Sequence, residues 1–89
     1  MDLIVEFPFH AREQMHERGA TEDEVRQVLH YGEMAEAKAP RLGRRMVFTE
    51  GYTWRGQFYP HKLVRIIYLV QPEKISMVTV YVYYGKWEV

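Results

Sequence analysis

The chain of 89 residues contains no cysteine, which excludes disulfide bonds and thiolate metal sites. Its single serine, Ser76, argues against a serine nucleophile, and neither a glycine-rich phosphate loop nor a nucleophile elbow is present. No apolar run approaches the length that spans a membrane. The opening residues 1–6 lack a basic segment followed by a long apolar one, so we expect no signal peptide and a cytoplasmic protein.

Net charge is also zero, which argues against strong, indiscriminate binding to nucleic acid. The charges are segregated, however: residues 1–37 carry a formal charge of −6, and residues 38–65 carry +6. This separation predicts a dipolar molecule with one basic region. That region either binds an anionic partner or is balanced by the acidic segment within the fold, and the sequence leaves both explanations open.

Length and composition predict one domain spanning residues 1–89. Two short helices come first. Residues 9–18 form the first, with Ala11, Met15 and Arg18 on one stripe, and Gly19 ends it. Residues 21–24 then read Thr-Glu-Asp-Glu, the pattern of a capping box that starts a second helix ending at Gly32.

The apolar period then changes to two, which predicts strands. A weak strand is predicted at 35–39, and stronger strands are predicted at 44–50, 63–70 and 75–84. Turns are predicted at 40–43 and 71–74, and the longest irregular stretch at 51–61. Before the helices, residues 2–7 are predicted to form a strand or an extended arm. Helices followed by strands predict an α+β fold, in which both helices pack on one face of a curved antiparallel sheet of about four strands.

The final predicted strand has two different faces, because side chains alternate across a strand. The two sets are Val78, Val80 and Val82, and Met77, Thr79, Tyr81 and Tyr83. The β-branched valines are predicted to face the core. The opposite face is aromatic and carries hydroxyls, so it is either a second packed surface or a floor for a polar or planar ligand.

The side chains left to carry chemistry are histidine, arginine, threonine and tyrosine. His10 and His16 do not share a helical face, so we expect no metal site on that helix, although distant histidines remain open as ligands. Such a set can cleave RNA through attack of its own 2′-hydroxyl, with histidine as base or acid and arginines holding phosphate. Tyrosines and Trp54 can stack on bases.

Two segments of the chain resemble a known family. Residues 9–25 contain a His-Ala-Arg…Arg-Gly helix and a Thr-capped second helix, and residues 78–81 read Val-Thr-Val-Tyr. In these features the chain resembles the bacterial domain-of-unknown-function family 4258, which is related to RelE/ParE-like toxins of the barnase–EndoU–colicin–RelE group. The resemblance implies a RelE-like fold that uses its helix-free face for RNA.

The candidate site residues come from two sources. By motif, the resemblance implies the catalytic residues His10, Arg18, Thr79 and Tyr81. Charge, strand placement and aromatic character add the substrate-binding candidates Arg45, Arg65 and Trp54. Each also has an ordinary structural explanation, such as His10 bonded to backbone, Arg18 paired with a neighbouring glutamate, or Tyr81 simply packed.

Three functions follow as hypotheses. The first is a toxin-like, metal-independent endoribonuclease of a toxin–antitoxin type system, which needs no cofactor and has RNA and an antitoxin as partners. The second is a non-catalytic module that binds nucleic acid or protein. The third is a homo-oligomer paired through the final strand, whose long, apolar edge must be covered; in a toxin, an antitoxin segment would cover it instead.

Overall fold

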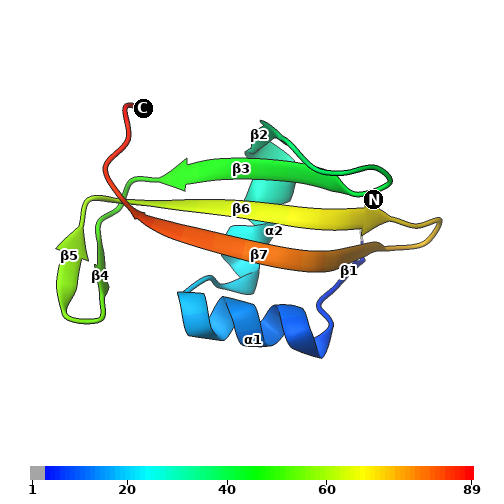
Figure 1. The fold of residues 1–89 in the computed structure, drawn as a ribbon, viewed down its shortest axis with the longest axis horizontal. Helices are drawn as coiled ribbons and strands as arrows, with labels where there is room; N and C mark the ends of the chain where they lie inside the picture. The colour runs from blue at the N-terminus through cyan, green and yellow to red at the C-terminus, as the bar shows by residue number, and fades with distance from the viewer. Residues whose placement is uncertain (1–3) are drawn as a thin grey trace.

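The computed structural model describes residues 4–89, and the sequence-based expectations for residues 1–3 lie outside them. Figure 1 shows the arrangement. In chain order the elements are β1 (Val5–Glu6), α1 (Phe9–Arg18), α2 (Glu22–Tyr31), β2 (Glu33–Ala35), β3 (Leu42–Phe48), β4 (Tyr52–Trp54), β5 (Gln57–Tyr59), β6 (His61–Val70) and β7 (Ile75–Gly85). The α+β class is confirmed.

Both helices end where the sequence predicts. Gly19 closes α1 in the left-handed conformation, with φ of 83° and its N–H donating to the Met15 carbonyl. Both capping-box bonds at the start of α2 are present: the Glu24 N–H donates to the Thr21 hydroxyl, and the Thr21 N–H donates to the Glu24 carboxylate. Among residues 4–89, no helix is long and apolar enough to cross a membrane.

The sheet is larger than predicted and is mixed rather than antiparallel. Its five strands run in the order β1-β7-β6-β3-β2, and β1 pairs parallel with β7. Strand β1 has only two residues, too few to show a period in the sequence. The prediction that residues 51–61 are irregular is wrong, because β4 and β5 form a separate hairpin. Positive φ at Arg55 and Gly56 suits the two-residue turn that joins them.

Both helices contribute to one core on one face of the sheet. In Figure 1, α2 crosses behind β6, while α1 runs alongside β7. The fully buried core side chains include Ala11 of α1, Val25 and Val28 of α2, and Val64, Ile66 and Val80 of the central strands. Each large apolar side chain buried in this way stabilises the fold by about 1.5–3 kcal/mol.

A β-bulge in β7 corrects the predicted faces of this strand. The pairing with β6 shifts between Ile67, opposite Thr79, and Tyr68, opposite Met77, so Val78 is the extra residue. Met77 therefore faces the helices and is only 1% exposed, whereas the alternation pattern assigned it to the opposite face. After the bulge the prediction is correct: Val80 and Val82 pack with the core.

Candidate functional site

The sheet face away from the helices carries most of the predicted site residues. Strand register aligns its side chains in rows across β3, β6 and β7: Val47–Leu63–Tyr83, Arg45–Arg65–Tyr81 and Gly43–Ile67–Thr79. We call these nine residues the open face. No helix of the described chain packs on it, and in its central row Arg45 is exposed while Arg65 and Tyr81 are half-buried.

The central row is extended by an arginine from α1. The Arg65 guanidinium carbon lies 5.2 Å from the centre of the Tyr81 ring, and that of Arg18 lies 5.5 Å from it. Both contacts fall within the range of cation–π attraction. Within residues 4–89, no carboxylate lies within ion-pairing distance of either guanidinium. Tyr81 therefore lies close to two positive charges that have no counter-ion among residues 4–89.

Neighbouring groups hold these two arginines in place. Arg65 donates to the backbone carbonyl of Glu36 at 3.0 Å, and Arg18 donates to the backbone carbonyl of Val80 at 2.7 Å. The Tyr84 hydroxyl in turn donates to the Arg18 carbonyl at 2.8 Å. Burial raises the pKa of Tyr84 above its ordinary value, which keeps this hydroxyl a donor.

Arg45 completes the basic row, although it is less available. It lies opposite Arg65 in the strand register, and its Nε donates to the Glu33 carboxylate at 2.8 Å. Both side chains of this pair are more than half exposed, so water screens their attraction. An incoming phosphate can therefore compete with Glu33 for Arg45.

His10 and Arg18 share one stripe of α1 with Gln14, at spacings of four residues. The Gln14 side-chain oxygen accepts a 3.1 Å hydrogen bond from the Val80 N–H, so its amide nitrogen donates to His10 Nε2 at 2.9 Å. His10 Nε2 is therefore the acceptor, and Nδ1 carries the proton. Arg18 is half-buried, whereas Ala11 and Met15, which share its predicted stripe, are buried.

Gln14 was missed by sequence reasoning. Its position four residues from both His10 and Arg18 was the available signal. Together, Gln14 and Arg18 bind the N–H and the carbonyl of Val80 at the outer side of β7. The exposed strand edge expected from the sequence is therefore covered by α1 at this residue.

Thr79 and Trp54 lie on opposite sides of the sheet. Thr79 is half-buried on the open face, two register pairs from Tyr81. Trp54 stacks on Tyr84 with ring centres 5.3 Å apart and an interplanar angle of 12°. Tyr84 pairs with the buried Lys62, so this stack is on the helix side of the sheet. Trp54 is thus separate from the open face, and its stack on Tyr84 packs the β4–β5 hairpin against β7.

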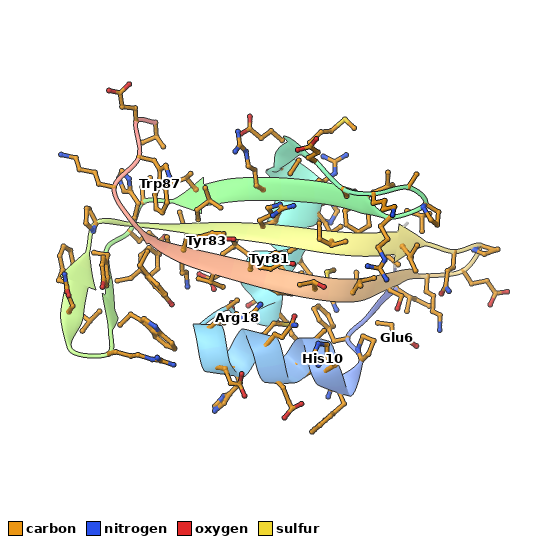
Figure 2. All side chains as sticks on the ribbon, in the orientation of Figure 1. Glu6, His10, Arg18, Tyr81, Tyr83 and Trp87 are labelled. Carbon is orange, nitrogen blue, oxygen red and sulfur yellow. The ribbon has the colours of Figure 1, made fainter. Side chains whose placement is uncertain are left out.

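A second aromatic group lies at the hairpin end of the open face: Tyr83, which the alternation pattern predicts on this face, and Trp87, which sequence reasoning did not select. Tyr83 is 47% exposed, and Trp87 follows the end of β7 near Gly85. The Trp87 N–H donates to His61 Nδ1 at 2.9 Å, which fixes the tail against β6. Figure 2 shows Tyr81, Tyr83 and Trp87 in succession along β7 and its tail, with Arg18 beside them on α1.

The chemistry available here is that of an anion site beside aromatic rings. Arginine forks donate to phosphate oxygens, and exposed aromatic rings stack on unpaired bases. Within residues 4–89, no three His, Asp or Glu side chains gather in a way that holds a metal ion. The protein groups of this site are therefore cations, a phenol and a threonine hydroxyl, while the imidazole of His10 lies about two turns of α1 away from Arg18.

Comparison with known proteins gives one match. A family model described as "Domain of unknown function (DUF4258)" matches residues 7–82, which include both helices and most of β7. No curated protein and no solved structure matches the chain. The matched region includes His10, Arg18, Arg65 and Tyr81. Since the match extends over most of the chain, the protein belongs to the DUF4258 family.

Proposed function

We propose that the protein binds single-stranded RNA on its open face. The observation that carries this proposal is the pair of guanidinium groups on the Tyr81 ring, neither of which has a counter-ion among residues 4–89. A phosphodiester supplies the missing negative charge and accepts from both arginine forks. Arg45 extends the same row toward the next phosphate.

Aromatic residues favour a single strand over a duplex. Tyr83 and Trp87 lie beside the arginine row, where unpaired bases can stack on them, whereas paired bases present no free face.

The distribution of charge along the chain also supports RNA binding on the open face. Residues 38–65, which include β3 and the first half of β6, carry +6, while residues 1–37 with both helices carry −6. Of this positive segment, Arg45 and Arg65 lie on the open face, where they attract phosphates.

The test is fluorescence anisotropy with a labelled single-stranded RNA at several salt concentrations. We expect affinity to fall as salt rises, and Arg65→Gln to weaken binding by about tenfold and reduce the salt slope by about one. Arg55→Gln, at the tip of the β4–β5 hairpin, is the matched control and should bind like the parent chain. Equal losses in both variants, or no binding at low salt, would refute the proposal.

A second candidate function is RNA cleavage by a RelE-like, toxin-type endoribonuclease with an antitoxin partner. It is favoured by His10 lying on the same α1 stripe as Arg18. In this reaction the 2′-hydroxyl of the RNA gives its proton to water, and its oxygen attacks the adjacent phosphorus. A 2′,3′-cyclic phosphate forms, the bond to the 5′-oxygen breaks, and that oxygen takes up a proton. To donate this proton, His10 must be an imidazolium, which carries a proton on Nε2 as well and therefore has to break its bond to the Gln14 amide.

Cleavage is tested separately from binding. Purified protein is incubated with labelled RNA in EDTA, and the products are examined for a 2′,3′-cyclic phosphate end. The cleavage hypothesis predicts that His10→Ala lowers the cleavage rate by 10²-fold or more while RNA affinity changes little, an effect typical of a general acid. Intact RNA together with tight binding would support RNA binding and refute cleavage. Growth arrest on expression, relieved by an adjacent gene, would support the toxin hypothesis.

A further inference from the structure

A groove of about 730 Å³ lies on the opposite part of the molecule from the β4–β5 hairpin, next to the turn between β6 and β7. Its apolar walls come from elements far apart in the sequence: Ile4, Leu29, Leu42, Tyr68, Val70 and Ile75. Ile4, Leu42 and Val70 are 66%, 42% and 60% exposed. Both the volume and the apolar lining are typical of sites that bind small molecules.

One charged side chain in the wall of this groove is tightly held but not neutralised. Arg44 is half-buried; its Nε donates to the Tyr68 hydroxyl at 3.1 Å, and its Nη1 donates to the Gly32 carbonyl at 2.9 Å. Both acceptors are neutral. Of the carboxylates that the structure describes, none lies within ion-pairing distance of Arg44, and its Nη2 has no hydrogen-bond partner in residues 4–89. Partial burial of an unpaired charge is unfavourable, so the site favours an anion.

The other charged groups of the lining leave a positive excess. Arg26 contributes a guanidinium that stacks on the Phe7 ring, and Lys74 is paired with Glu6 at 2.8 Å. Glu73 is the acidic side chain of the lining. The positive groups therefore outnumber the negative one, and they border an apolar floor.

We propose that this groove binds a small organic carboxylate with an extended apolar body, such as an aliphatic chain. The carboxylate accepts from the free Nη2 of Arg44, and the chain covers Leu29, Leu42 and Val70. An uncharged ligand would leave Arg44 unneutralised, and a small inorganic anion would leave the apolar walls in water. Only a ligand with both parts satisfies both features.

Isothermal titration with decanoate, kept below the concentration at which it forms micelles, tests the proposal on the full chain. We expect one saturable site per chain. Acetate, which lacks the chain, and decanol, which lacks the charge, should each bind at least tenfold more weakly. Failure of decanoate to saturate at millimolar concentration, or equal binding of decanol, would overturn the assignment.

Two variants locate the binding to this groove. Arg44→Gln removes the charge and should weaken decanoate binding at least tenfold. Because Arg44 also makes bonds within the fold, Val70→Glu is the second variant: its position is on the exposed rim, and the new carboxylate repels the ligand. Arg55→Gln, on the distant hairpin, should bind decanoate like the parent chain. Unchanged binding in Val70→Glu would exclude this groove as the site, whatever the outcome for RNA.

Discussion

The Arg18 guanidinium donates a 2.7 Å hydrogen bond to the carbonyl of Val80, a residue 62 positions further along the chain. Gln14, one turn earlier on α1, accepts from the N–H of the same residue. One helix thereby covers both outward-facing backbone groups of β7 at this point. The same bond holds the Arg18 guanidinium beside Tyr81, so the edge contact and the proposed RNA site depend on one side chain.

Replacing Arg18 by methionine should therefore lower the stability of the fold. The variant loses a charge-assisted hydrogen bond to Val80, and we expect the free energy of unfolding to fall by about 1.5–3 kcal/mol in urea denaturation. Arg55→Met is the control, since Arg55 is an exposed residue at the hairpin turn, and it should change stability by less than about 0.5 kcal/mol. Similar losses in the two variants would show that the bond does not hold α1 to β7.

Gly19 and Gly56 offer a matched pair of substitutions. Both have positive φ, 83° and 81°, so alanine is strained at either position by about 1–2 kcal/mol. At Gly19 a Cβ would also meet the Tyr84 hydroxyl and lie 2.8 Å from Cζ3 of Trp54, whereas at Gly56 nothing lies within 4 Å. Overpacking adds about 1–3 kcal/mol to the cost at Gly19 alone.

Thermal or urea unfolding of the two alanine variants measures this difference directly. Gly19→Ala should be the less stable variant by at least about 1 kcal/mol, because both carry the backbone strain and only one carries the clash. Equal stability would mean that Trp54 and Tyr84 do not pack against the end of α1 as described.

The buried ion pair between Lys62 and Glu24 joins β6 to the start of α2. Its N–O distance is 2.6 Å, and the side chains are 6% and 14% exposed. The Lys62 ammonium also donates to the Gly19 carbonyl at 2.9 Å. Replacing Lys62 by methionine leaves the Glu24 charge buried without its counter-ion, so we expect a loss of about 3–5 kcal/mol.

A double-mutant cycle measures the coupling free energy between Lys62 and Glu24. Glu24→Gln retains a side chain that can accept in the capping box but removes the charge. If the ion pair carries the effect, the double variant should lose less stability than the sum of the two single variants. Strict additivity would show that Lys62 and Glu24 act independently.

The exposed pair between Glu6 and Lys74 predicts a pH dependence. The hydrogen bond from Lys74, and then its charge, lower the pKa of Glu6. A carboxyl group with a lower pKa in the folded state stabilises the fold above its ordinary pKa, and this contribution is lost as pH falls through the folded value. Lys74→Gln should thus lower the melting temperature at pH 7, and the difference from the parent chain should shrink below about pH 4.

Lys86→Gln serves as the control for this experiment. Lys86 lies in the C-terminal tail and makes no ion pair with any residue from 4 to 89. Its replacement should leave the melting temperature close to that of the parent chain at both pH values. A Lys74→Gln deficit that is the same at pH 3 and pH 7 would contradict the role given to Glu6.

Local sequence signals predict the helices well. Gly19 and the capping box of Thr21 and Glu24 act within a few residues, so they can be recognised without knowledge of the fold. The bulge at Val78 has no such signal, because it depends on how β7 aligns with β6. The alternation pattern therefore placed Met77 on the wrong face.

The site could be predicted only in part, for the same reason. Charge and strand placement selected Arg65, and the motif resemblance selected Arg18 and Tyr81, which the fold brings together. Trp54 was selected for its aromatic ring, but its stack on Tyr84 results from a hairpin whose turn, at Arg55 and Gly56, lacks the common Asn-Gly or Asp-Gly signature. Long-range packing thus decides which aromatic residues reach the open face.

The most direct test of the proposed RNA function is NMR mapping of the protein with a hexauridylate. If single-stranded RNA binds the open face, the largest chemical-shift changes should occur at Arg65, Tyr81 and Tyr83, with α2 almost unaffected, and they should decrease as salt is raised. Changes concentrated on α2, or none at low salt, would contradict it.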